Sequence, residues 1–181
     1  MRTYWKLLAA SCAIAGVAQA APPTTPAATA PAPAVAKPAP SDRAQIQALE
    51  KGFSAALSAK NVNGIMSYYT HDGLFVFDVA PPRQHVGWAD YRKDWQDFIG
   101  EVPGPMTFTL SDLAITVVGP VAWSHSIQGL RYAAKDGSKK EIVVRVTDVY
   151  RKLAGKWLIV QEHVSVPVDV DTGKADLMSK P

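Results

Sequence analysis

Two neighbouring segments in the last third of the chain carry side chains that could bind an anion or move a proton. Arg145 and Thr147 stand two residues apart in a run of β-branched residues. His163 and Ser165 have the same spacing in the next such run. Side chains on a strand alternate between its faces, so each pair shares one face. A guanidinium suits a carboxylate or phosphate, and an imidazole can transfer protons near neutral pH.

Two arrangements remain open for Arg145 and His163, because a buried polar group is costly unless it is hydrogen bonded. In the first, both residues line a pocket that recognises an anion. In the second, Arg145 is a buried structural ion satisfied by a carboxylate, for which the candidates are Asp78, Asp148 and Glu162. Both arrangements place polar residues inside an apolar ribbon.

Four further residues are candidates for the same site. Asp78 ends a short apolar run before two prolines, where a carboxylate can act as a base or form the turn. His125 lies between two serines, either lining a cavity or half exposed on a strand. Tyr69 and Trp88 are first of all core aromatic residues and, as a second interpretation, cavity-wall residues that contact a ligand.

Several common chemistries have no matching pattern in the sequence. No His-x-His or Glu-x-x-His pair offers metal-ligand spacing. No glycine-rich phosphate loop and no Gly-x-Ser-x-Gly nucleophile motif is present. His71 and His85 fall in turns, where we expect them to be solvated. The sequence therefore predicts no metal site and no cofactor.

A series of long strands must position the candidate residues. Runs rich in β-branched and aromatic residues alternate with turns at Gly119-Pro120, Asp136-Gly137 and Ala154-Gly155. The predicted strands cover residues 106–118, 121–134, 139–152 and 156–166. The last two form a long antiparallel hairpin.

The first half of the domain predicts helices around one short strand. These are a helix capped by Ser41 or Asp42 and ending at Lys60, a short helix capped by Asn63, a strand over 74–78, and an aromatic-rich helix over 88–99. Helices gathered before a meander of strands predict an α+β domain, with the helices packed on one face of a curved sheet.

The first 40 residues have the composition of export and linker segments. Two basic residues precede an apolar run over 7–17, and Ala18-Gln19-Ala20 is typical of a signal-peptidase site. We expect residues 1–20 to be a signal peptide, which predicts a periplasmic or secreted protein. Residues 21–40 form an Ala/Pro-rich linker. A rival interpretation makes Cys12 a lipidated cysteine.

The remaining residues predict one domain without thiol chemistry. The chain has a net charge of +3, but three basic and no acidic residues precede residue 41, so residues 41–181 are neutral. They contain no cysteine, which excludes disulfides and thiolate sites there. The charge gives no support for nucleic-acid binding, and nothing beyond export predicts membrane contact. We expect a domain over 41–168 and a C-terminal tail over 169–181.

Three short stretches carry a resemblance to a known family. They are Arg145-Val-Thr-Asp-Val-Tyr-Arg151, Gly155-Lys-Trp-Leu-Ile159 and Glu162-His-Val-Ser-Val-Pro167. With the order of elements, they resemble the SnoaL-like branch of the nuclear transport factor 2-like superfamily over residues 44–168. They are similar to the subgroup that includes the association domain of calcium/calmodulin-dependent protein kinase.

The resemblance implies a cone-shaped α+β barrel. About three N-terminal helices would pack on a strongly curved, mostly antiparallel sheet that opens at one end into an apolar cavity. Arg145, Thr147, His163 and Ser165 match positions that face this cavity in the family. The resemblance also implies a homodimer through the outer face of the sheet.

The superfamily's steroid isomerases resemble the chain more distantly. They use an Asp base with an oxyanion hole made of Tyr and a protonated Asp. The matching positions here are Asp78, or a position one residue away, for the base, and Phe53 and Thr147 for the two donors. Loss of one oxyanion donor costs roughly a hundredfold in rate, so this mechanism is not predicted.

Three functions therefore remain open. The first, which we carry forward, is binding of a small, largely apolar ligand in the cone, in one version a ligand that bears a carboxylate. The second is a lyase, isomerase, cyclase or dehydratase in which His163 or Asp78 transfers a proton and Arg145 anchors the substrate. The third is a homo-oligomer assembly domain without catalysis.

Overall fold

The computed structural model describes residues 40–179, so the predicted signal peptide and almost all of the predicted linker lie outside the described residues. The elements follow the order α1 (Asp42–Ser58), α2 (Val62–Met66), β1 (Phe75–Phe77), β2 (His85–Val86), α3 (Trp88–Gly100), β3 (Met106–Val118), β4 (Val121–Ala133), β5 (Lys139–Leu153) and β6 (Lys156–Ser165). None of the helices in this range has the length and apolar character that crossing a membrane requires.

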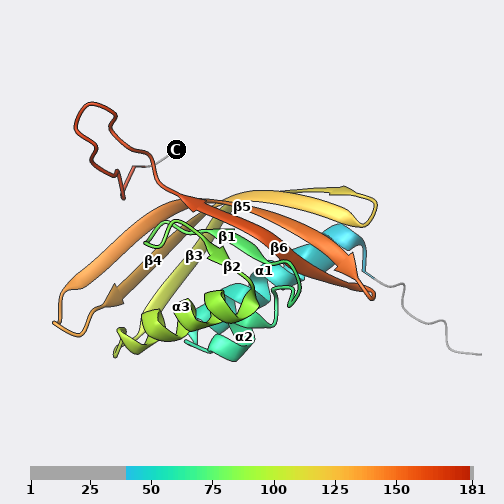
Figure 1. The fold of residues 1–181 in the computed structure, drawn as a ribbon, viewed down its shortest axis with the longest axis horizontal. Helices are drawn as coiled ribbons and strands as arrows, with labels where there is room; N and C mark the ends of the chain where they lie inside the picture. Colours follow the sequence, from blue (N-terminus) through green and yellow to red (C-terminus); the bar gives the residue numbers. More distant parts are fainter. Residues whose placement is uncertain (1–39, 180–181) are drawn as a thin grey trace, which may run out of the picture. The chain divides into compact units, whose positions relative to one another are not determined.

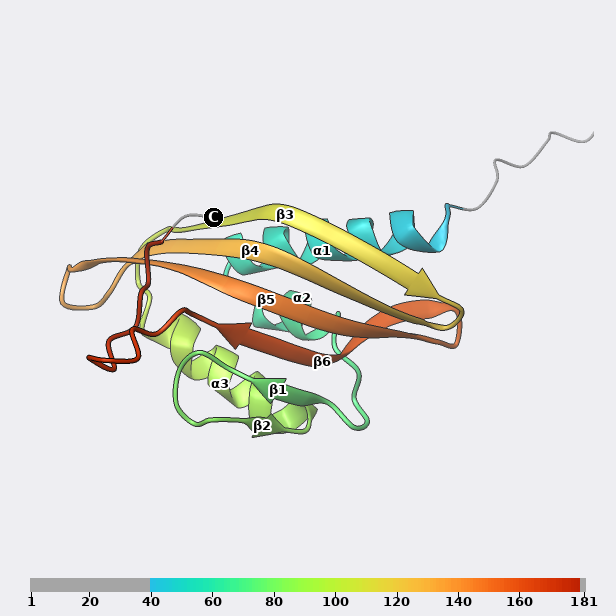
Figure 2. The same cartoon turned by 90° about the horizontal axis from the view of Figure 1, so that it is seen from above.

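The domain is built on one curved, open sheet of six strands. Its strands lie in the order β2-β1-β6-β5-β4-β3. Neighbouring strands are antiparallel except for β1, which runs parallel to β6. Figure 1 shows the sheet arching over the three helices, and Figure 2 shows β1 and β2 beside β6. The predicted α+β class and helix-on-sheet arrangement are confirmed, and the sheet stays open rather than closing into a barrel.

The hairpin of β5 and β6 turns where the sequence predicts. Ala154 and Gly155 have φ angles of 47° and 82°. Two consecutive positive φ values characterise the type I′ turn, whose twist matches that of the flanking strands. This tight turn brings the two strands into register.

A β-bulge in β6 changes which residues face inward. Val149 pairs with Gln161, whereas Tyr150 pairs with Ile159, so Val160 is an additional residue on β6. An extra residue reverses the alternation of faces beyond it, because the side-chain period of a strand is two. Ile159 is buried before the bulge, and beyond it the buried residue is Glu162.

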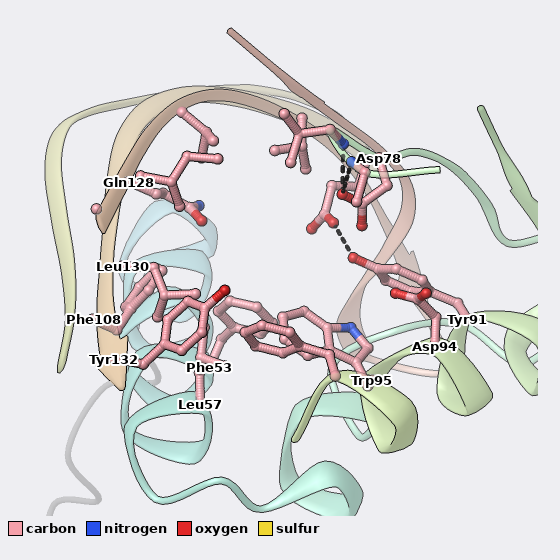
Figure 3. Close-up of a pocket in the computed structure, with 18 residues that line it drawn as sticks. Phe53, Leu57, Asp78, Tyr91, Asp94, Trp95, Phe108, Gln128, Leu130 and Tyr132 are labelled. Atoms are coloured by element: carbon pink, nitrogen blue, oxygen red, sulfur yellow. Dashed lines mark hydrogen bonds between the residues drawn. The ribbon is translucent and has the colours of Figure 1, made fainter. Parts of the chain in front are cut away.

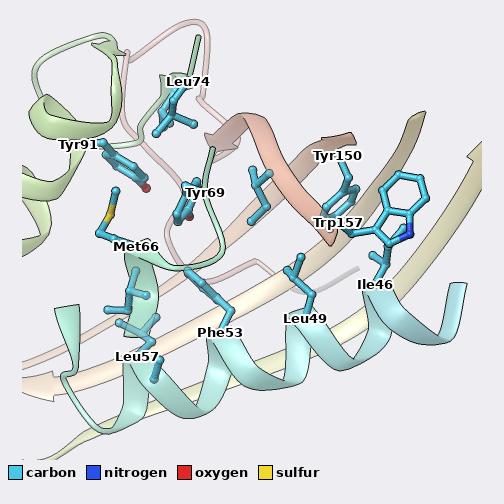
Figure 4. Close-up of a cluster of buried hydrophobic side chains, with 14 of the residues drawn as sticks. Ile46, Leu49, Phe53, Leu57, Met66, Tyr69, Leu74, Tyr91, Tyr150 and Trp157 are labelled. Carbon is cyan, nitrogen blue, oxygen red and sulfur yellow. The ribbon is translucent and has the colours of Figure 1, made fainter. Parts of the chain in front are cut away.

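The hydrophobic core lies between α1 and the concave face of the sheet. Apolar residues at helical spacing give α1 its buried stripe, which consists of Ile46, Leu49, Phe53, Ala56 and Leu57. Figure 4 shows this stripe facing Tyr69, Tyr150 and Trp157. The Phe53 ring meets four other rings edge to face, those of Tyr68, Tyr69, Trp95 and Phe108. Such aromatic pairs stabilise beyond their burial and fix one wall of the interior.

Two details of the helices differ from the prediction. The N-cap of α2 is Asn61, whose Oδ1 accepts a hydrogen bond from the Gly64 N–H at 3.0 Å. The expected cap, Asn63, instead accepts from Arg92 at 2.8 Å. The short strand β2 was not predicted, because two residues show no periodicity.

The segment after β6 folds back onto the sheet. Val168 and Ala175 form an isolated antiparallel bridge. The carbonyl of Leu177 accepts a hydrogen bond from the Val143 N–H at 2.9 Å. Val143 lies on β5 beyond the end of its pairing with β6. The predicted C-terminal tail thus covers part of the edge that β6 leaves open.

Candidate functional site

A cavity of about 300 Å³ opens between the helices and the concave face of the sheet. Its apolar wall comes from both long helices and four strands and includes Phe53, Leu57, Trp95, Phe98, Phe108, Leu130, Tyr132, Ile142, Val144 and Val164. Its polar groups are those of Asp78, Tyr91, Asp94, Gln128 and Glu162. Figure 3 shows Asp78, Tyr91 and Asp94 together on one side, across the cavity from Gln128 and Leu130. The cavity is therefore apolar with one acidic end.

Glu162 lies at this acidic end and is almost completely buried. The hydroxyl of Tyr69 donates to its Oε2 and that of Tyr91 to its Oε1, both at 2.7 Å. The second of these bonds is visible in Figure 3. Burial raises the pKa of Glu162 to about 7, against the lowering effect of the Tyr91 and Tyr69 hydrogen bonds. The side chain is thus fixed in orientation and able to change its protonation near neutral pH.

A second carboxyl group lies deeper, behind Glu162. Asp148 is the cross-strand partner of Glu162 on β5 and is 2% exposed. Burial raises its pKa, and the negative charges of Glu162 and Glu50 raise it further. The Tyr150 hydroxyl lies 2.7 Å from Glu50 Oε1 and 3.5 Å from Asp148 Oδ2. Because a phenol has one proton, Tyr150 can donate to one of these carboxyls at a time.

No lysine or arginine in the described part of the chain forms an ion pair with these buried carboxyls. Among residues 40–179 the ion pairs of lysine and arginine all involve other acidic groups. An isolated buried carboxylate is costly and tends to keep its proton instead. The carboxyl groups buried under the concave face of the sheet therefore keep their protons to higher pH than exposed carboxyl groups do.

Asp78, His85 and Asp94 form a second cluster at the acidic end of the cavity. Asp78 Oδ1 accepts hydrogen bonds from the backbone N–H groups of Val79, at 2.5 Å, and Ala80, at 3.2 Å. His85 Nε2 lies 3.8 Å from Asp94 Oδ1, too far for a hydrogen bond. Burial raises the pKa of Asp94, against the lowering effect of His85. These side chains come from the end of β1, from β2 and from α3.

The polar residues first singled out on β5 and β6 do come together. Arg145 pairs with Ser165, and Thr147 with His163 on one side and His125 on the other. However, Arg145, Thr147, His163 and His125 are exposed, Ser165 is half buried, and none lines the cavity. Their predicted placement on the cavity wall was wrong, as was the alternative of a buried structural Arg145. The bulge at Val160 puts Glu162 inside and His163 outside.

The other predicted residues have different outcomes. Asp78 lines the cavity, as its proposed role requires. Tyr69 is buried and reaches the site only through Glu162. Trp88 donates from Nε1 to the Met66 carbonyl at 3.0 Å and stacks on His71, so it has a packing role. His85 was predicted to be solvated, but it is 3% exposed, so that prediction was wrong.

Several residues of the site escaped the sequence reasoning. On α3, Tyr91, Asp94, Trp95 and Phe98 follow the spacing i, i+3, i+4, i+7 and all line the cavity. An aspartate on the apolar stripe of a helix is a signal that could have found Asp94. Glu162 and Gln128 gave no such signal, because their strands carry polar residues on both faces.

The curved open sheet over three helices, with a cavity inside the cone, defines the fold of the nuclear transport factor 2-like superfamily. A protein of this fold and of unknown function from Pseudomonas putida KT2440 is 30% identical, with a TM-score of 0.68, covering 78% of this chain and 99% of its own. The sequence profile of the SnoaL-like domain matches residues 46–169. The chain therefore belongs to the SnoaL-like family.

Two more distant structures show the fold alone. A candidate calcium/calmodulin-dependent protein kinase II association domain from Xanthomonas campestris is 22% identical, with a TM-score of 0.62 over 75% of this chain and 95% of its own. A candidate scytalone dehydratase from Novosphingobium aromaticivorans is 17% identical, with a TM-score of 0.62 over 68% of this chain and 82% of its own. No curated protein matches the sequence.

Proposed function

We propose that the cavity binds a small, largely apolar molecule that is neutral or cationic, and that Glu162 exchanges a proton with it. The observation that carries this proposal is the buried Glu162 carboxyl, held by two tyrosine hydroxyls at the acidic end of an aromatic cavity. The remaining wall matches the flat apolar part of a ligand. The reaction class is an isomerisation or a dehydration.

The charge of the lining argues against the carboxylate-bearing ligand considered from the sequence. That ligand depended on Arg145 as an anchor, and Arg145 lies outside the cavity. The lining contains three carboxyl groups and no lysine or arginine. A carboxylate on the ligand would find no cationic partner in this lining and would be repelled.

The hydrogen bonds and the burial of Glu162 favour a role in proton transfer. A general acid or base must be fixed near the reacting atom and must gain and lose its proton near the working pH. Tyr69 and Tyr91 fix both oxygens of Glu162, and burial supplies the second condition. Asp78, the base considered from the sequence, borders the same cavity and is oriented by two backbone N–H groups.

The candidate scytalone dehydratase of similar fold supports the reaction class by analogy only. Binding without catalysis is the second candidate, favoured by the mostly apolar lining of the cavity. Export to the periplasm or the medium, and a homodimer, complete the proposal. N-terminal sequencing of the exported protein and light scattering test these two points.

A thermal-shift screen with neutral, cationic and carboxylate-bearing aromatic compounds tests the ligand class. A ligand at one hundred times its dissociation constant adds about 2.7 kcal/mol to the free energy of unfolding. We expect neutral or cationic hits that are lost when the cavity is filled by Leu130→Trp and kept in the outer-face control Arg145→Ala. Hits confined to carboxylates that depend on Arg145 would contradict the proposal.

The best hit is then tested for turnover with Glu162→Gln. This variant keeps the size of the side chain but cannot exchange the proton, so it should bind the ligand and lose turnover by about a hundredfold or more. His163→Ala, next to it on the other face, should keep full turnover. Unchanged turnover in Glu162→Gln would remove Glu162 from the chemistry.

A further inference from the structure

The geometry points to a second function at the acidic end of the cavity, a binding site for one divalent metal ion formed by Asp78, His85 and Asp94. Each of the three residues offers one ligand atom, and these atoms lie within 4.8 Å of one another. Two ligands of one ion stand at most about 4 to 5 Å apart, twice the usual metal–ligand distance. Small side-chain rotations therefore suffice to bring all three atoms to one ion.

His85 is the residue that marks the cluster as a site. Its side chain is 4% exposed. Its Nε2 is buried and has no hydrogen-bond partner among residues 40–179. Asp94 Oδ1 lies 3.8 Å from it. A buried ring nitrogen without a partner is costly, and an ion between Nε2 and Asp94 would satisfy it.

Asp90 holds the imidazole in the orientation that a metal ligand needs. Its Oδ2 lies 3.2 Å from His85 Nδ1 and also accepts a hydrogen bond from the Val86 N–H at 3.1 Å. With the proton on Nδ1 donated to Asp90, the lone pair of Nε2 is directed toward Asp94 and Asp78. Metal-binding histidines usually donate their other N–H to a carboxylate in this way.

The local charge also favours a cation. Asp78, Asp90 and Asp94 surround His85, and no lysine or arginine in the described residues forms an ion pair with them. Lys93, on the same helix, pairs with Asp97 instead. A divalent ion would neutralise carboxylates that the protein leaves without a basic partner.

The ligand set selects the kind of ion. One imidazole and two carboxylates suit Zn²⁺ or Mn²⁺ better than Mg²⁺ or Ca²⁺, which prefer oxygen alone. Three protein ligands leave a coordination position free, as in catalytic zinc sites. Asp78 and Asp94 line the cavity, so an ion held between them would border the space that a ligand occupies.

The role of the ion, but not its binding, rests on the proposed function. An ion at this position would polarise a carbonyl or hydroxyl oxygen of the ligand near Glu162. It would supply the electrophile that Phe53, at the position of the steroid isomerases' Tyr, cannot provide. Metal binding is therefore measured apart from turnover.

Isothermal titration of the metal-stripped full chain with Zn²⁺ and Mn²⁺ tests the site. We expect one ion per chain, with affinity lowered at least tenfold by Asp94→Asn and by His85→Gln. Asp90→Asn removes the partner of Nδ1 and should weaken binding about 10- to 100-fold. The matched controls are Asp97→Asn, one turn further along α3, and the exposed His163→Ala. Both should bind like the wild type.

Two outcomes would overturn the inference. One is no saturable binding of either ion up to about 1 mM, the weak limit for metal modules. The other is wild-type affinity in Asp94→Asn, a half-exposed position where the fold should be kept. Circular dichroism of each variant separates lost binding from lost folding. Ligand binding by the metal-free protein bears on the proposed function alone, so the two ideas fail separately.

Discussion

The two faces of the β5–β6 hairpin place polar side chains under opposite conditions. On the outer face, Arg145, Thr147 and His163 are in contact with water, where a charge or an imidazole costs little. On the inner face, Asp148 and Glu162 are buried without any basic partner among residues 40–179. Burying a carboxyl is costly, so the two faces of the hairpin differ in the energetic cost of their polar side chains.

The inner face itself divides into a closed and an open part. The Tyr150 hydroxyl joins Glu50, Asp148 and Ser124 within the core, away from the cavity. Glu162 has comparable hydrogen bonds but borders the cavity. The closed part can therefore only stabilise the fold, whereas the open part can also meet a ligand.

The largest effect should separate the two faces at adjacent positions. Val146 is 2% exposed and Thr147 is exposed. A carboxylate introduced at Val146 would therefore be buried, and one introduced at Thr147 would be in water. We expect Val146→Asp to lower the free energy of unfolding by more than about 4 kcal/mol or to prevent folding, because it adds a fourth carboxyl to Glu50, Asp148 and Glu162, which have no basic partner among the described residues. Thr147→Asp should change it by less than about 0.5 kcal/mol. Urea unfolding followed by circular dichroism measures both, and similar losses would contradict the assignment of the faces.

The second effect is a pH dependence of stability. The usual pKa of a glutamate side chain is 4.5, and burial raises that of Glu162 to about 7 in the fold because it favours the protonated form. The contribution of Glu162 to the free energy of unfolding is complete below pH 4.5 and is lost as the pH rises through about 7. Between these two values the folded state holds a proton that the unfolded state has released, so raising the pH favours unfolding. The difference corresponds to about 3 kcal/mol. Asp148 and Glu50 act in the same direction.

Glu162→Gln is the control for this pH dependence. The amide cannot titrate, so the loss of stability between pH 5 and about 7.5 should shrink in the variant. Urea midpoints at half-unit steps of pH measure the two slopes. If the wild type gained stability over this range, Glu162 would have to be ionised in the fold, and the interpretation of a proton-holding interior would be wrong.

The third effect is smaller and tests the closed part. Tyr150→Phe removes the hydroxyl shared by Glu50, Ser124 and Asp148 without changing the ring. Leaving buried polar groups without a partner costs about 1 to 3 kcal/mol. Tyr132→Phe is the matched control, because Figure 3 shows its hydroxyl at the cavity rather than in the core. Equal effects of the two changes would show that the buried network adds nothing.

The fold could be read from the sequence because its signals are local. The long strands keep period two between glycine-containing turns, and their observed ends lie within one residue of the predicted ones. The stripe of α1 gives its buried face in the same way. The two-residue strand β2 has no such signal, and this hid the burial of His85.

The site could be predicted only in part because its geometry depends on one inserted residue. Strict alternation from Trp157 predicts that Ile159, Gln161 and His163 share a face, and the bulge at Val160 breaks this after Ile159. A bulge depends on how two strands pair, which the composition of one strand does not contain. Asp78 was identified because it ends a short apolar run before two prolines, a signal that does not depend on which face of the strand a residue takes.

The smallest expected effects are those of Arg145→Leu and His163→Ala, the residues that the sequence placed at the centre of the site. Both side chains are exposed, so each change should alter the free energy of unfolding by less than about 0.5 kcal/mol. Ligand-induced thermal shifts and metal affinity should also stay at wild-type values, because neither residue lines the cavity. Loss of ligand binding in either variant, with stability unchanged, would reverse the comparison. The outer face of the hairpin would then be the ligand-binding surface, and Glu162 would have a structural role, like the carboxyl groups around Tyr150.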